Sequence, residues 1–256
     1  MFLPMPMKVA YKTDVGKKRT HNEDSILVDE PLHIFLLADG MGGHKAGEVA
    51  SDLAVKESYA WLKENIGKAR NIGDVSNLLV ESLLKAHRTV KARATTDINL
   101  AGMGTTFIQM LVVGNNAHIC HVGDSRAYHL GSEIKQITQD HTSEMYFVKN
   151  GALEEGYLPV QKMRVLTQAV GGQATLIPEV KQVKLNPKDI LLLCSDGLTD
   201  MLSDIEIESV IQKYRDNLPV AADNLILEAN DKGGIDNISV ILVEYEPQSS
   251  DKILCS

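Results

Sequence analysis

Four aspartates lie at the ends of apolar runs, each close to a glycine. Three of them follow such a run and the last precedes one: Asp39, Asp124, Asp196 and Asp236. A carboxylate delivered to the end of a buried strand is costly unless a cation neutralises it. Carboxylate oxygens without histidine or cysteine ligands favour Mg²⁺, Mn²⁺ or Ca²⁺ over zinc or copper. The pattern therefore predicts one shared site that holds divalent metal ions.

Such a site could activate a water molecule for attack on a phosphorus atom. A carboxylate shared by two ions sets them about 3.5 to 4 Å apart, and a water between them becomes acidic enough to attack. Gly40 would let the backbone approach an ion closely, so that its carbonyl could be a ligand. Asp-Gly is also an ordinary turn dipeptide, and Asn237 beside Asp236 fits a turn as well. The turn interpretation weakens because all four aspartates accompany a predicted buried strand.

Arg19 lies in a polar stretch, residues 16–24. A guanidinium group clamps a phosphoryl group through two parallel hydrogen bonds, which an ammonium group cannot do. Taken alone, the stretch is more typical of a solvated basic turn. No glycine-rich nucleotide loop of the P-loop type is present. Arg19 is therefore the candidate for contacting a phosphoryl group.

The elements that must position these residues follow from hydrophobic periodicity. Helices are expected at about 46–66, 74–94, 204–213 and 219–230, with Asp74 as an N-cap and Gly67 as a C-cap glycine. An irregular segment, 138–174, is expected to contain a short helix near 142–149. Strands are expected at 8–14, 25–29, 32–38, 105–113, 117–122, 127–130, 133–137, 179–184, 189–195 and 237–244. Along the chain these elements run as strands, two helices, a group of strands, two helices and a last strand. This order predicts an α+β fold, an antiparallel β-sandwich flanked on each side by a pair of helices.

Composition narrows the class of protein. The 256 residues carry a net charge of -8 without a lysine- or arginine-rich block, so we expect no nucleic-acid partner. No apolar run approaches the roughly 20 residues of a spanning helix, so we expect no membrane partner and a cytoplasmic location. The three cysteines suggest no disulfide framework, and Cys120 and Cys194 are expected to be small buried hydrophobes.

Six short motifs occur in order along the chain. They are Arg-Thr-His-Asn-Glu-Asp at 19–24, Ala-Asp-Gly-Met-Gly-Gly-His at 38–44, Gly-Met-Gly-Thr-Thr at 102–106, Val-Gly-Asp-Ser-Arg at 122–126, Ser-Asp-Gly-Leu at 195–198 and Gly-Gly-Ile-Asp-Asn-Ile-Ser at 233–239. Together they resemble the bacterial metal-dependent protein serine/threonine phosphatases, the PPM family of type 2C. The resemblance runs from about residue 8 to residue 246. It implies a single domain over 1–256, with a flap at about 138–174 and a frayed tail at about 247–256.

The resemblance also implies a binuclear Mn²⁺ or Mg²⁺ centre at one end of the sandwich. Carried over by position, Asp39 would bridge the two ions. Asp196 and Asp236 would hold the first ion. Gly40, through its carbonyl, and Glu23, directly or through water, would help to hold the second.

Further roles follow from the same resemblance. Asp124 with Asp196 would form a weaker third metal site. Arg19 would bind the substrate phosphate, and Asp24 would orient the attacking water. Animal relatives carry their general acid, a histidine, directly after the first Asp-Gly. Here that place is Met41, so His44 or water is left as the proton donor.

The implied reaction is hydrolysis of phosphoserine and phosphothreonine in proteins by metal-activated water. The partners would be phosphorylated proteins, targets of a serine/threonine kinase. One alternative is a catalytically silent phosphoprotein-binding or regulatory module, which would predict loss of ligands, whereas all four aspartates are present. A second alternative, a metal phosphodiesterase acting on nucleic acid, is disfavoured by the acidic charge balance.

Overall fold

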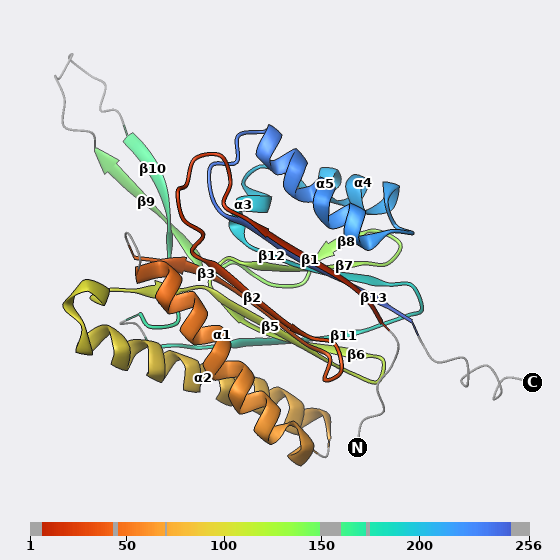
Figure 1. Ribbon diagram of the computed structural model, residues 1–256, viewed down its shortest axis with the longest axis horizontal. Helices are drawn as coiled ribbons and strands as arrows, with labels where there is room; N and C mark the ends of the chain where they lie inside the picture. Colours follow the sequence, from red (N-terminus) through yellow and green to blue (C-terminus); the bar gives the residue numbers. More distant parts are fainter. Residues whose placement is uncertain (1–6, 43–45, 70, 149–159, 173–174, 247–256) are drawn as a thin grey trace, which may run out of the picture.

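Two antiparallel sheets pack face to face in the computed structural model, which describes residues 7–42, 46–69, 71–148, 160–172 and 175–246 (Figure 1). The first sheet has the strand order β1 (Met7–Asp14), β13 (Ile238–Tyr245), β12 (Ile190–Cys194), β7 (Arg126–Leu130) and β8 (Ile134–Gln136). The second has the order β11 (Glu179–Lys184), β6 (Asn116–Val122), β5 (Phe107–Val113), β3 (Ile34–Met41) and β2 (Asp24–Asp29). The short β4 (Gly104–Thr105) pairs with the end of β3.

A pair of helices covers the outer face of each sheet (Figure 1). The long α1 (Ala46–Asn65) and α2 (Ile72–Thr96) cover the second sheet. The first sheet is covered by α4 (Asp204–Lys213) and α5 (Leu218–Asp231). Shorter helical pieces are α3 (Asp196–Thr199), η1 (Ile66–Lys68) and η2 (Ile98–Leu100). The expected α+β sandwich with a helix pair on each side is confirmed.

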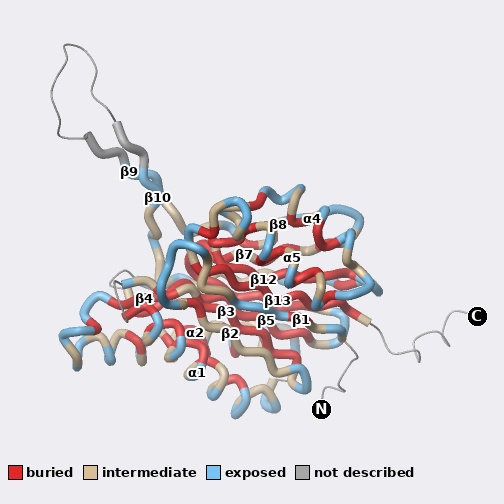
Figure 2. Tube along the Cα trace, turned by 45° about the horizontal axis from the view of Figure 1, so that its top comes forward, coloured by how far each residue is buried: buried red, intermediate tan, exposed pale blue. Residues whose placement is uncertain are grey.

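Strand β3 shows why its sequence is apolar without interruption. Side chains alternate between the two faces of a strand. Ile34 and Leu36 point to the core under α1 and α2, whereas Phe35 and Leu37 point to the core between the sheets. Figure 2 shows the buried segments running through all layers of the molecule. A strand buried on both faces carries whatever follows it to a fixed place at the edge of its sheet.

Two predicted helix ends differ in the structure. The N-cap of α2 is Asn71, whose side chain accepts a hydrogen bond from the backbone N–H of Asp74. The side chain of Asp74 accepts in turn from the backbone N–H of Asn71, which completes a capping box. The prediction of Asp74 as the N-cap was therefore wrong by three residues, since Asp74 occupies the N3 position. Gly67 lies inside the 3₁₀ helix η1, not at a left-handed C-cap, so that prediction was also wrong.

The expected short helix near 142–149 is a strand. Strand β9 (Thr142–Val148) pairs antiparallel with β10 (Val160–Leu166), and the hairpin projects beyond one end of the sandwich (Figure 1). Residues 149–159 and 173–174 of the flap region, and the tail 247–256, lie outside the described residues. Among the residues that are described, no helix has both the length and the apolar character needed to cross a membrane.

Candidate metal and phosphate site

The predicted acidic residues meet at one end of the sandwich because strand ends converge there. In the β2–β3 pair, Asp24 lies opposite Asp39. Strands β12 and β13 are antiparallel neighbours, so the end of β12 lies beside the start of β13. Asp196 comes two residues after the last residue of β12, and Asp236 comes two residues before the first residue of β13. The topology therefore brings together carboxylates that are far apart in the sequence.

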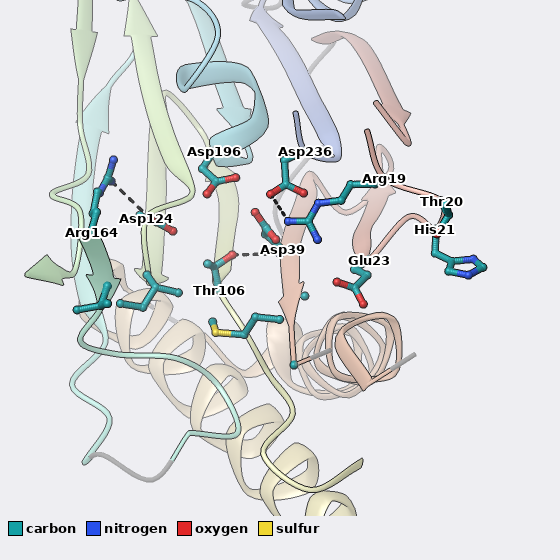
Figure 3. A pocket seen from close by; sticks show the side chains of 15 residues that line it. Arg19, Thr20, His21, Glu23, Asp39, Thr106, Asp124, Arg164, Asp196 and Asp236 are labelled. Carbon is teal, nitrogen blue, oxygen red and sulfur yellow. Dashed lines mark hydrogen bonds and ion pairs between the residues drawn. The ribbon is translucent and has the colours of Figure 1, made fainter. Parts of the chain in front are cut away.

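One pocket collects most of the predicted site residues (Figure 3). Its lining includes seven of the nine: Arg19, Glu23, Asp39, Gly40, Asp124, Asp196 and Asp236. Figure 3 shows Asp39 between Asp196 and Asp236, with Glu23 to one side. Asp24 does not line the pocket and is buried next to it. His44 lies outside the described residues.

The pKa values of the crowded carboxylates are raised above the usual range of aspartate. Burial, and then the charges of Asp24 and Asp196, raise the pKa of Asp39 well above its usual range. Burial, with the charges of Asp124 and Asp200, raises the pKa of Asp196 to about 7. Asp196 Oδ1 is buried without a hydrogen-bond partner among the described residues. Such a cluster is stabilised by a cation, since a cation offsets both the desolvation and the mutual repulsion.

Hydroxyl groups support Asp24 from behind the pocket. Ser195 Oγ and Ser239 Oγ donate to Asp24 Oδ2 at 2.8 and 2.6 Å. Burial raises the pKa of Asp24 to about 6, although these two hydrogen bonds oppose the shift. The other oxygen, Oδ1, is buried and has no partner among the described residues. Asp24 is thus held in one orientation with one oxygen free.

Asn237 ties the loops around the pocket together. Its side chain donates to the carbonyls of Val15 and His21 at 2.8 and 2.9 Å. Its Oδ1 accepts from the backbone N–H of Glu23 at 2.8 Å. Sequence reasoning treated Asn237 as simple turn chemistry and missed this role. Its place next to Asp236 in the motif at 233–239 was the available signal.

Gly40 allows the end of β3 to approach α1. A Cβ at this position would lie 2.2 Å from the carbonyl oxygen of Gly47 and 2.5 Å from that of Glu23, both in fixed backbone. The N–H of Gly40 donates to the carbonyl of Glu23 at 3.1 Å. Only glycine fits this close approach, and Gly40, although buried, contributes to the lining of the pocket.

Two arginines face the carboxylates from opposite sides of the pocket (Figure 3). Arg19 Nη2 lies 2.7 Å from Asp236 Oδ2. Arg164 of β10 lies 3.5 Å from Asp124 Oδ2 and also pairs with Asp140. Sequence reasoning did not foresee Arg164, because it assigned residue 164 to an irregular segment. The pocket therefore has acidic groups for cations and basic groups at its rim for an anion.

Comparison with known proteins agrees with this geometry. The sequence matches the Protein phosphatase 2C family over residues 16–223. It is 35% identical over 244 residues to the serine/threonine phosphatase stp of Listeria innocua, covering 93% of this chain and 96% of the relative. It is 31% identical to the serine/threonine phosphatase of S. agalactiae, with a TM-score of 0.80 and coverage of 94% and 100%. The catalytic domain of PstP, in complex with two manganese ions, is 31% identical with a TM-score of 0.75, covering 94% and 98%.

An antiparallel sandwich with an acidic pocket at one end thus defines a phosphatase of the metal-dependent class. The chain belongs to the protein phosphatase 2C family. The resemblance stated from the six motifs is confirmed, and so is the expectation of a phosphatase.

Proposed function

We propose that the protein hydrolyses phosphoserine and phosphothreonine in other proteins, using two Mn²⁺ or Mg²⁺ ions held in the acidic pocket. The observation that carries this proposal is the convergence of Asp39, Asp196 and Asp236 in one pocket, where their charges repel one another without a cation. The relatives named as serine/threonine phosphatases, and the two manganese ions of PstP, support the same conclusion.

The residues present fit this pair of ions. Asp39 lies between the other two carboxylates, as a bridging ligand would (Figure 3). Asp196 and Asp236 would hold the first ion, and the Gly40 carbonyl with Glu23 would hold the second. Oxygen ligands of this kind suit Mg²⁺ and Mn²⁺. Asp124, together with Asp196, would contribute to a weaker third site at the Arg164 side of the pocket.

When bound, the ions would lower the pKa of a water and neutralise charge on the phosphoryl oxygens. Arg19 would then exchange Asp236 for the substrate phosphate, which it can bind through two parallel hydrogen bonds. Asp24, held by two serine hydroxyls behind the pocket, stays a prediction as the residue that orients the attacking water. His44 stays a prediction as the general acid. A single phosphatase domain over 1–256, a cytoplasmic location and a kinase that supplies the substrates also stay predictions.

The test is hydrolysis of p-nitrophenyl phosphate and of a phosphothreonine peptide, with Mn²⁺ or Mg²⁺ and after full chelation. We expect turnover of both substrates with metal and none without it. Asp39→Asn should lose nearly all turnover and still give a folded circular-dichroism spectrum. Activity that survives chelation would remove the metal mechanism. Phosphopeptide binding without turnover under any divalent ion would favour the silent module instead.

A further inference from the structure

We propose that His121, His141 and Glu179 form a separate binding site for a transition-metal ion of the zinc class, beside the loop that carries Asp124. The three residues come from the end of β6, the segment between β8 and β9, and the start of β11. Each offers one ligand atom, and these atoms all lie within 4.8 Å of one another. None of the three lines the acidic pocket, so this would be a site with different ligands and a different ion.

The two histidines are brought together by packing. The imidazole of His121 is fully buried and stacks on that of His141, with ring centroids 4.8 Å apart and an interplanar angle of 17°. Burial lowers the pKa of both imidazoles, which keeps the rings neutral and able to bind a metal. Two neutral imidazoles side by side place two nitrogen donors in one small volume, and because the rings are nearly parallel, one of them must rotate for both lone pairs to meet at one ion.

Two buried polar atoms of this cluster, one on His121 and one on Glu179, have no hydrogen-bond partner among the described residues. Glu179 Oε1 pairs with Lys181 Nζ at 2.7 Å, whereas Oε2 lies 3.7 Å from His121 Nε2. Oε2 has no hydrogen-bond partner among the described residues. His121 Nε2 lies 3.0 Å from the carbonyl oxygen of Gln139. Because a carbonyl only accepts, Nε2 carries the proton and the lone pair of Nδ1 is left unused in the interior.

Unpaired buried polar atoms are rare and call for a specific cause, such as an ion. A histidine that donates one ring N–H to a backbone carbonyl and has its other nitrogen free is arranged as metal-bound histidines usually are. Two imidazoles and one carboxylate match the ligands that zinc prefers, with one position left open, whereas Mg²⁺ and Ca²⁺ prefer oxygen alone. The ligand chemistry therefore selects zinc or a similar ion over the ions of the acidic pocket.

Metal binding at this site would change the hydrogen bonds of the loop that carries Asp124. His141 Nδ1 accepts from the backbone N–H of Gly123 at 3.2 Å, and the N–H of His141 donates to the Gly123 carbonyl at 2.9 Å. A metal on Nδ1 would displace the first of these bonds. A metal on Nε2 would move the ring proton to Nδ1, where it would face the Gly123 N–H. Either way, occupancy changes the environment of Gly123, the residue before Asp124.

The experiment uses the visible spectrum of Co²⁺, which absorbs strongly in a four-coordinate site with nitrogen ligands and weakly in a six-coordinate oxygen site. The full chain is stripped of metal, given excess Mg²⁺ to occupy the acidic pocket, and titrated with Co²⁺. We expect a strong band that saturates at one ion per chain and disappears when Zn²⁺ is added. Binding of Zn²⁺ should also shift the amide resonance of Gly123. No substrate is present, so the outcome does not depend on phosphatase activity.

Two variants make the assignment specific. Glu179→Gln should weaken Co²⁺ binding about 100-fold or more, since even loss of an outer partner of a metal ligand costs roughly 10- to 100-fold. Lys181→Gln is the matched control, because it removes the same ion pair and leaves the carboxylate in place. His141→Asn should abolish the strong band, with circular dichroism to show that the chain is folded. The absence of a strong band, or an equal loss in Glu179→Gln and Lys181→Gln, would overturn the proposal.

Discussion

Arg19 illustrates how one side chain can serve the pocket in two states. In the structure Arg19 pairs with Asp236. In the metal-bound protein, the proposed ions would neutralise Asp236 in place of Arg19. Freed from this pair, the guanidinium can bind phosphate. We predict that Arg19→Ala lowers kcat/KM for a phosphothreonine peptide by roughly 10- to 150-fold. This corresponds to the roughly 1.5 to 3 kcal/mol of a hydrogen bond to a charged group.

The neighbouring Lys17 provides the control for this prediction. Its ammonium group pairs with Asp231 on the exposed surface, 3.2 Å away, and not with the pocket. Lys17→Ala should therefore leave kcat/KM nearly unchanged, and Arg19→Lys should recover only part of the loss, because lysine lacks the two parallel donors. An unchanged kcat/KM in Arg19→Ala would mean that this residue does not contact phosphate.

At the scale of single residues, the sequence identified the charged residues of the pocket better than the residues that hold them in place by hydrogen bonds. Asp39, Asp196 and Asp236 could be found because a carboxylate at a buried strand end is unusual in itself. Ser195, which holds Asp24, carries no such signal. Its role depends on which strands are neighbours, and small hydroxyl residues are common near strand ends. Local pattern cannot supply that information.

The β9–β10 hairpin is tied to the sandwich by a cluster of charges at Asp140. This carboxylate accepts from Arg126 Nε and Nη2 at 3.0 and 2.8 Å, and also pairs with Arg164 of β10. Burial opposes ionisation, but the hydrogen bonds from Arg126 dominate and keep the pKa of Asp140 below its usual range. We predict that Asp140→Asn lowers the free energy of unfolding by about 1 to 3 kcal/mol, because half-buried Arg126 loses its charged partner.

Urea denaturation with all metal conditions held fixed measures this change. The control is Asp223→Asn, which removes an exposed ion pair with Lys12 and should change stability by less than about 0.5 kcal/mol. If the cluster anchors the hairpin, Asp140→Asn should also increase the rate of amide hydrogen exchange more in β10 than in β12. Equal stability of the two variants would show that Asp140 does not anchor it.

The elements were predicted well where the signal is local. The bounds of α4 and β11 agree with the predicted ranges, since a capping box at Ser203 and a short alternating run define them. The segment at 142–148 failed because its partner, β10, follows a stretch broken by glycine and proline. Pairing with a distant strand provides its backbone hydrogen bonds, and β-propensity depends strongly on such context.

On the scale of the whole molecule, the acidic pocket should make folding depend on metal and pH together. The pKa of Asp24 is raised to about 6 and that of Asp196 to about 7, and burial also raises that of Asp39. An unfolded aspartate titrates near pH 3.9. Between about pH 4 and pH 7 the metal-free folded chain therefore binds more protons than the unfolded chain. This contribution to stability falls as the pH rises through that window.

Asp39→Asn isolates this effect, because it removes one charge of the cluster and keeps the shape of the side chain. In chelator at pH 8, we predict that the variant is more stable than the wild type by about 1 to 2 kcal/mol, since one pKa unit corresponds to about 1.4 kcal/mol. The difference should shrink at pH 5, where the wild-type cluster is largely protonated. With saturating Mn²⁺ the order should reverse, because ions that bind only the folded wild type stabilise it. Chemical denaturation of both chains under these three conditions measures the effect. A variant that is less stable than the wild type in chelator at pH 8 would show that the carboxylates do not repel one another in the folded protein, and the electrostatic argument for a metal centre would lose its basis.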